Sequence, residues 1–143
     1  MSHELSRIIY ADDDEDILSV ATLSLEVVGG LSVSTCGGGQ EALEKARDMR
    51  PDLIMLDVMM PGMDGPTTLK AVRADPELAA TPVILLTARV RNTEVDEYLD
   101  IGADGVIAKP FDPMTLADEV RAIWATAKAR GPKPAKGDLG RVA

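Results

Sequence analysis

The sequence predicts an α/β fold, a (βα)5 doubly wound sheet of five parallel strands. Two observations and one general rule predict it. Apolar runs of about four to six residues alternate with segments whose apolar residues recur at helical spacing. Gly and Pro separate most of these segments. Strands joined by helices pair in parallel, and right-handed crossovers place helices on both faces of the sheet.

Five segments have the composition of strands. Four of them are nearly continuous apolar runs, at residues 7–11, 52–57, 82–87 and 106–108. Such runs are typical of parallel strands that are buried on both faces. Residues 31–35 instead alternate apolar side chains with serine, which indicates a half-exposed strand at the sheet edge.

The segments between the strands have helical spacing. The predicted helices are residues 14–28, 40–49, 66–74 and 93–101. Asp112 and Pro113 are expected to cap and begin a final helix. The residues that we place on the buried face of the first helix are Ile17, Val20, Ala21, Leu25 and Val28. Those on the buried face of the last helix are Leu116, Val120, Ile123 and Ala127.

Length and composition indicate one globular domain. With 143 residues, 45% of them hydrophobic, the chain is long enough for one core and too short for two ordinary ones. We expect residues 6–128 to form the domain, and residues 129–143, rich in Gly, Pro and Lys, to be a flexible C-terminal tail or linker. No apolar run approaches the roughly 20 residues that span a bilayer, and no signal peptide is visible, so a cytoplasmic protein is expected.

The net charge and the single cysteine argue against non-specific nucleic-acid binding and against disulfide or zinc-cluster sites. The net charge of −9 argues against direct, non-specific nucleic-acid binding by the domain as a whole. It suits a protein that binds a metal ion or a basic partner surface. Cys36 is the only cysteine, so one chain can form neither a disulfide nor a zinc cluster. Because Cys36 closes an apolar alternation, we interpret it as a small buried side chain.

Polar residues stand where four of the predicted strands end. Asp12 and Asp13 follow the first strand, Asp57 ends the third, and the next two strands end at Thr87 and Lys109. The carboxyl ends of parallel strands meet at one edge of the sheet, where such folds bind ligands. Three crowded carboxylates repel one another, and a hard cation such as Mg²⁺ removes that repulsion. The alternative is that acids after a strand merely cap the next helix, as Asp14 is expected to do.

Asp57 differs from the other acids because a Gly- and Pro-rich loop, rather than an acidic helix start, follows it. An accessible aspartate in a metal-lined pocket can attack phosphorus and form an acyl phosphate. Thr87 could donate a hydrogen bond to a phosphoryl oxygen, and Lys109 could pair with the anion. Taken singly, Thr87 could equally be an ordinary strand end and Lys109 a surface lysine.

The chain resembles the receiver domain of two-component response regulators over about residues 6–128. The segments that carry the resemblance are Ala11-Asp12-Asp13-Asp14, Leu56-Asp57 with the following residues to Gly65, Leu86-Thr87-Ala88 and Lys109-Pro110-Phe111. The resemblance implies the flavodoxin-like strand order 2-1-3-4-5. It also implies a signalling domain that catalyses only its own phosphoryl transfer and autodephosphorylation.

The resemblance implies a role for each site residue. Asp57 would accept a phosphoryl group from a phosphohistidine on a sensor histidine kinase or phosphotransfer protein. Asp13 and Asp57 would ligate Mg²⁺ directly, and Asp12 would hold metal-bound water. The backbone carbonyl of Met59 would supply another oxygen. Lys109 would pair with the phosphoryl group, Thr87 would move toward it, and the Lys109–Pro110 peptide would be cis.

The resemblance also implies how the signal leaves the domain. The fourth helix, fifth strand and fifth helix of the family often form a face that binds a downstream protein or a second receiver, so monomer and homodimer both stay open. Tyr98 and Trp124 lie on those helices, either as exposed anchors or as partly buried side chains. Val106 stands where the family commonly has an aromatic switch residue. We therefore expect the backbone of residues 88–93 to carry the signal instead.

Three alternatives remain. The chain could be the receiver part of a larger multidomain regulator or hybrid kinase, with residues 129–143 beginning a linker. It could be a haloacid-dehalogenase-like phosphatase, although that family requires Asp-x-Asp and Met59 stands two residues after Asp57. A phosphate-blind scaffold is the third, and the complete set of acids, hydroxyl and ammonium argues against it.

Overall fold

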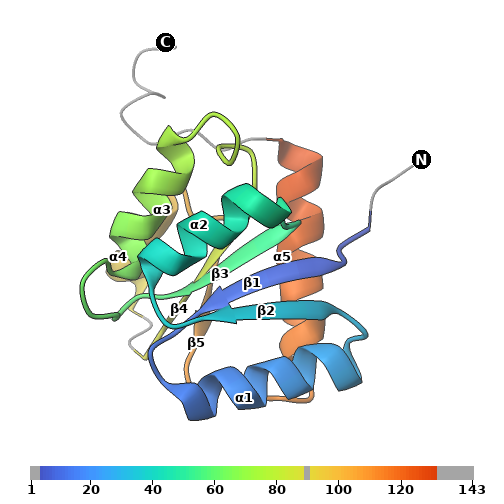
Figure 1. The fold of residues 1–143 in the computed structure, drawn as a ribbon. Helices are drawn as coiled ribbons and strands as arrows, with labels where there is room; N and C mark the ends of the chain where they lie inside the picture. The colour runs from blue at the N-terminus through green and yellow to red at the C-terminus, as the bar shows by residue number, and fades with distance from the viewer. Residues whose placement is uncertain (1–3, 89–90, 132–143) are drawn as a thin grey trace.

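Five parallel strands form one sheet in the order β2-β1-β3-β4-β5 (Figure 1). The computed structural model describes residues 4–88 and 91–131. The strands are β1 (Arg7–Ala11), β2 (Ser32–Cys36), β3 (Leu53–Asp57), β4 (Val83–Thr87) and β5 (Gly105–Ala108). Each predicted strand is present within one residue at either end, and the predicted strand order is confirmed.

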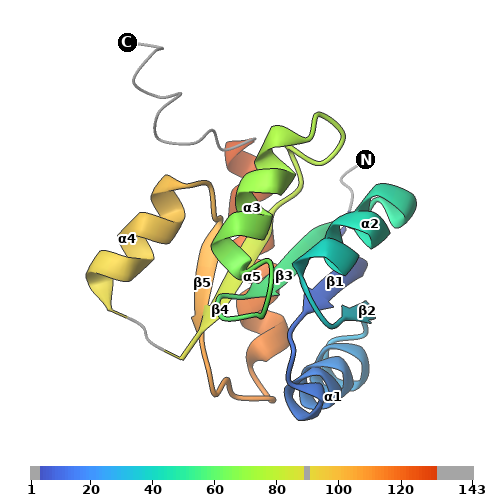
Figure 2. The same ribbon diagram turned by 60° about the vertical axis from the view of Figure 1, so that its left-hand side comes forward.

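Helices cover both faces of the sheet, as Figures 1 and 2 show. They are α1 (Glu15–Leu23), α2 (Gly39–Met49), α3 (Gly65–Ala74), α4 (Asn92–Asp100) and α5 (Leu116–Arg130), with a π-helical segment η1 (Ser24–Val28) after α1. One core contains side chains from α2 and α3, and the other contains side chains from α1 and α5. The doubly wound α/β prediction is therefore confirmed.

Side chains of β1 alternate between the two cores. Ile9 and Ala11 belong to the core under α2 and α3, whereas Ile8 and Tyr10 belong to the core under α1 and α5. This alternation is the ordinary two-residue period of a strand. Every residue of β3 and β4 is buried, as expected for central parallel strands. Cys36 is also buried, which confirms its structural interpretation.

The first helix departs from the prediction. Residues 14–28 were expected to form one α-helix, but its last five residues, from Ser24, have π-helical geometry. Ala21 and Leu25 are fully buried as predicted, while Val20 and Val28 are 46% and 49% exposed. The wider π turn changes the angle between successive side chains, so spacing extrapolated from an α-helix misplaces Val28. Val20 lies at the margin of a narrow contact face.

The start of the last helix is also corrected. The Asp112 carboxylate accepts the backbone N–H of Met114 at 2.9 Å, and its carbonyl accepts that of Leu116 at 2.9 Å. These bonds close a turn, and α5 begins only at Leu116. The helix continues to Arg130, two residues past the predicted domain end. Most of the predicted tail, residues 132–143, lies outside the described residues.

The two aromatic residues proposed as interface anchors are not prominent on the surface. Trp124 is only 8% exposed, and its indole N–H donates to the carbonyl of Asp52 at 3.0 Å. Of the two alternatives that the sequence left open for Trp124, the exposed anchor is therefore wrong and the buried side chain is confirmed. Tyr98 is half-buried and packs against the core under α2 and α3, which is the alternative that the sequence left open.

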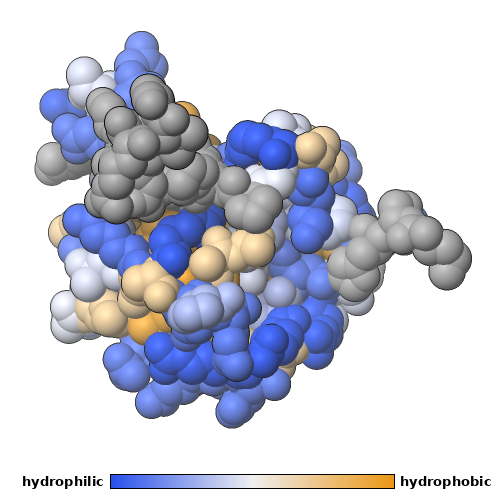
Figure 3. Space-filling model, turned by 90° about the horizontal axis from the view of Figure 1, so that it is seen from above, coloured by the Kyte–Doolittle hydropathy of each residue, from blue (hydrophilic) through white to orange (hydrophobic). Residues whose placement is uncertain are grey.

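Hydrophilic residues cover most of the face seen from above, where they surround a smaller apolar area (Figure 3). This agrees with the excess of acidic residues in the chain. Of the helices in the described part of the chain, none has both the length and the apolar character of a membrane span.

Candidate functional site

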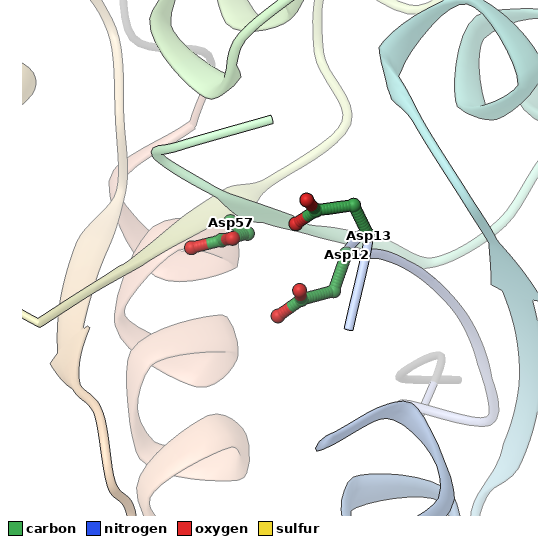
Figure 4. A group of neighbouring side chains, drawn as sticks. All are labelled: Asp12, Asp13 and Asp57. Carbon is green, nitrogen blue, oxygen red and sulfur yellow. The ribbon is translucent and has the colours of Figure 1, made fainter. Parts of the chain in front are cut away.

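Three carboxylates meet at the carboxyl edge of the sheet. Asp12 and Asp13 project from the end of β1 toward Asp57 at the end of β3 (Figure 4). One oxygen from each lies within 4.8 Å of the others. Asp12 is fully buried, Asp57 is 5% exposed, and Asp13 is exposed. Oxygen-only donors that open to solvent on one side fit a hard divalent cation such as Mg²⁺.

Lys109 brings one positive charge to this cluster. Its Nζ lies 3.0 Å from Asp12 Oδ2 and 3.1 Å from Asp57 Oδ1. Since β4 lies between β3 and β5, the long side chain reaches across the end of β4 to make these contacts. The Lys109–Pro110 peptide is cis, as the resemblance implied. One ammonium against three carboxylates leaves a surplus of about two negative charges, which a divalent cation would neutralise.

Asp12 has two further hydrogen-bond donors. The Tyr10 hydroxyl donates to Asp12 Oδ2 at 3.0 Å, and the backbone N–H of Asp14 donates to Oδ1 at 2.9 Å. The sequence interpretation missed Tyr10, because its phenol ring fits an apolar run. A signal was present, since residues two apart in a strand share a face and Tyr10 stands two before Asp12.

Burial and charge shift the ionisation of the cluster. Burial, followed by the charge of Asp12, raises the pKa of Asp57, while Lys109 opposes this shift. Burial alone would lower the pKa of Lys109, but its hydrogen bonds to Asp12 and Asp57 raise it above the ordinary value. Burial and the charge of Asp12 also raise the pKa of Tyr10, which keeps the hydroxyl protonated as a donor.

The other predicted residues lie around this cluster. Thr87 is buried at the end of β4, and its carbonyl accepts the N–H of Lys109 at 2.9 Å. The backbone N–H of Met59 is hydrogen-bonded to Asp57, while the Met59 side chain is 77% exposed. Asp14 accepts the N–H groups of Asp16 and Ile17, so it caps α1 as expected. Helix capping therefore explains Asp14 but not Asp12.

The expected signalling loop is described only in part. Val106 is half-buried in β5 and pairs with Leu85 of β4. Residues 89–90 lie outside the described residues, so a role for residues 88–93 in transmitting the signal stays a prediction.

Comparison with protein families and curated proteins agrees with the geometry. The family model described as "Response regulator receiver domain" matches residues 8–121. The chain is 39% identical over 116 residues to the DNA-binding response regulator MtrA of Mycolicibacterium paratuberculosis, covering 81% of this chain and 50% of that protein. It is 36% identical over 120 residues to the transcriptional regulatory protein CseB of Streptomyces avermitilis, covering 84% and 49%. The chain thus spans about half the length of these curated relatives.

Solved structures give the same result. The chemotaxis response regulator CheY4 of Vibrio cholerae has a TM-score of 0.78 and 34% identity, covering 83% of this chain and 98% of that one. The signal receiver domain of a signal transduction histidine kinase from Syntrophus aciditrophicus has a TM-score of 0.75 and 32% identity, covering 86% and 92%. The phosphatase alternative is not favoured. The chain belongs to the receiver domains of two-component response regulators.

Proposed function

We propose that Asp57 accepts a phosphoryl group from a phosphohistidine on a sensor kinase or phosphotransfer protein. One observation supports this most strongly. The Asp57 carboxylate lies within 4.8 Å of two other carboxylates and 3.1 Å from the Lys109 ammonium, at an open sheet edge. A carboxylate oxygen of Asp57 attacks phosphorus, the phosphorus–nitrogen bond to histidine breaks, and the bond electrons return to the imidazole.

We assign a role to each neighbouring carboxylate from its exposure and its hydrogen bonds in the structure. We assign Asp13 and Asp57 as direct Mg²⁺ ligands, because Asp13 is exposed and Asp57 faces it. Asp12 is assigned to metal-bound water, since Tyr10, Asp14 and Lys109 already donate to its oxygens. When bound, Mg²⁺ supplies positive charge against the phosphoryl oxygens.

One backbone carbonyl and two side chains complete the proposed site. The Met59 carbonyl is assigned as a further metal ligand. Lys109 turns from Asp12 and Asp57 to the phosphoryl oxygens, and the Thr87 hydroxyl donates to one of them. Phosphorylation adds about 1.5 to 2 negative charges beside these donors. That change is large enough to bias a two-state element that includes Thr87.

We propose that the phosphorylated domain signals by protein–protein contact through the face formed by α4, β5 and α5. We assign the domain to residues 6–130, because α5 ends at Arg130 rather than at the predicted residue 128, and we assign the residues that follow to a tail or linker. Two relatives are named as DNA-binding or transcriptional regulators, but this chain spans about half of each. The net charge of −9 gives the present sequence no evident affinity for nucleic acid. A cytoplasmic location stays a prediction from the sequence.

The test is mass spectrometry of the intact protein after incubation with acetyl phosphate and Mg²⁺. Wild type is expected to gain one phosphoryl group, and the gain should disappear in EDTA. Asp57→Asn should gain none. Asp48→Asn is a matched control, because Asp48 is an exposed acid on α2, away from the cluster. No gain in wild type, or an equal gain in Asp57→Asn, would overturn the proposal.

A further inference from the structure

The Asp12 carboxylate accepts hydrogen bonds from three donors, so few of its acceptor positions are open to a metal ion. A carboxylate offers about four acceptor positions on its two oxygens. Oδ2 accepts both the Tyr10 hydroxyl and the Lys109 ammonium, each at 3.0 Å. Oδ1 accepts the Asp14 N–H at 2.9 Å. About one acceptor position therefore remains, which suffices for a hydrogen bond from a metal-bound water.

The three donors differ in what phosphorylation does to them. The Asp14 N–H belongs to the turn that starts α1, and its position is fixed by the backbone. Lys109 is shared between Asp12 and Asp57, so it has two competing partners before any phosphoryl group arrives. Tyr10 has no such competition from Asp57. It is fully buried among side chains from α1, α5 and the central strands.

Strand geometry explains why tyrosine suits this position. Tyr10 and Asp12 are two residues apart and lie on the same side of the sheet, about 6–7 Å apart along the chain. A phenol spans that distance while its ring fills the core. Its hydroxyl adds a hydrogen bond without adding charge, so it does not weaken the attraction of the acidic cluster for a cation.

We propose that the Tyr10 hydroxyl is a positioning group for phosphoryl transfer. It holds Asp12 in place for metal-bound water before phosphorylation, and it keeps Asp12 there when Lys109 leaves for the phosphoryl oxygens. The inference rests on the proposed function of Asp57. Without the hydroxyl, a buried carboxylate would lose a donor at the moment Lys109 moves away, and leaving such a group under-satisfied is costly. Tyr10 thus keeps Lys109 exchangeable and the metal-bound water oriented.

The test compares Tyr10→Phe with Tyr98→Phe. Both remove one phenolic hydroxyl, and Tyr98 is the other tyrosine of the chain, half-buried on α4. For Tyr10→Phe, calorimetry should show the Mg²⁺ dissociation constant raised about 5- to 10-fold, the scale of one hydrogen bond. The phosphorylation rate with acetyl phosphate at saturating Mg²⁺ should also fall. Tyr98→Phe should match wild type in both measurements.

A double-mutant cycle separates positioning from general packing. If Tyr10 acts through Asp12, Tyr10→Phe should change Mg²⁺ affinity little further in an Asp12→Asn background. Equal effects in both backgrounds would overturn the proposal. So would a Tyr10→Phe protein that is less stable yet binds Mg²⁺ and accepts phosphoryl like wild type.

A measurement on wild type covers the case in which Tyr10→Phe does not fold. NMR should detect a slowly exchanging Tyr10 hydroxyl proton that persists after beryllofluoride and Mg²⁺ are added. Its loss on that addition would contradict the proposal. The two claims fail separately: absence of phosphoryl transfer in wild type rejects the function of Asp57, whereas unaffected Tyr10→Phe kinetics reject only the role of Tyr10.

Discussion

Two clusters of charged side chains lie at opposite edges of the same sheet and are organised differently. The carboxyl-edge cluster consists of Asp12, Asp13, Asp57 and Lys109. The amino-edge cluster consists of Arg73, Asp104 and Arg130, beside the starts of β4 and β5. The first has three acids against one base. The second has two guanidinium groups against one acid, with backbone carbonyls as further acceptors.

The donors and acceptors of the amino-edge cluster are matched. Arg73 donates to the carbonyls of Gly102, Ala79 and Thr81 at 2.7–3.1 Å, and to Asp104 Oδ2 at 2.8 Å. Asp104 also accepts the N–H of Val83 at 2.8 Å and pairs with Arg130. The cluster therefore ties α3 and α5 to the strand starts.

The contrast distinguishes a structural cluster from a functional one. Full pairing of buried charges offsets their desolvation and fixes the surrounding elements. A surplus of buried like charge does the opposite, because it destabilises the folded state until a cation arrives. We infer that the amino edge stabilises the fold and that the carboxyl edge gives up stability in order to bind a ligand.

The largest expected effect is the loss of the Arg73 side chain. Arg73→Ala should cost about 3–5 kcal/mol of unfolding free energy, because three carbonyls lose the Arg73 donor and Asp104 loses its most buried cationic partner. Urea unfolding measures this loss. Arg47→Ala is the control, since Arg47 pairs with Asp75 at the surface with its side chain 46% exposed, and it should change stability far less. Equal losses of stability in the two variants would contradict the claim that the amino-edge cluster stabilises the fold.

Two matched Asp→Asn substitutions, one in each cluster, should change the stability of the folded protein in opposite directions. Asp104→Asn is expected to lose about 2 kcal/mol, because two guanidinium groups lose their shared carboxylate. Asp57→Asn, measured in EDTA, is expected to gain on the order of 1 kcal/mol, since it relieves repulsion from Asp12 and Asp13. Thermal unfolding of both variants decides the matter. A loss of stability in Asp57→Asn would contradict the idea of a surplus negative charge.

The gain in Asp57→Asn should depend on pH. Burial and Asp12 raise the folded-state pKa of Asp57 above 3.8, so the folded protein holds that proton more tightly than the unfolded chain. Wild type therefore loses stability relative to the variant as pH rises through the folded-state value. The stability of Asp57→Asn relative to wild type should be greatest at neutral pH, and the difference should shrink toward pH 4. An advantage that grew on acidification would contradict the assigned pKa direction.

The sequence predicted the carboxyl-edge cluster well, because strand ends are visible in it. Each apolar run stops at a polar residue, and parallel strands bring such ends together. Asp12, Asp13, Asp57 and Lys109 were all identified in this way. The role of Tyr10 was missed, because a tyrosine in an apolar run is usually a core residue. Only its position two residues before Asp12, on the same face of the strand, indicates a contact with that carboxylate.

The amino-edge cluster had no comparable signal. Arg73 and Asp104 are 31 residues apart and stand in segments that read as a helix and a turn. Their pairing depends on tertiary packing that no local pattern encodes. The π-helical turn after Leu23 was also missed, because the spacing of residues 14–28 fits one α-helix, and the sequence left open whether Trp124 is exposed or buried. The burial of Trp124 involves a tertiary contact, its hydrogen bond to the carbonyl of Asp52.

Titration of the metal-free protein with Mg²⁺, followed by calorimetry, tests the central claim most directly. Wild type should bind one Mg²⁺ saturably, and Asp104→Asn should do the same at a temperature where it is folded. Asp13→Asn and Asp57→Asn should lose that binding, because each removes one of the carboxylates whose excess negative charge attracts Mg²⁺. Absence of saturable binding in wild type, or undiminished binding in both carboxyl-edge variants, would contradict the account.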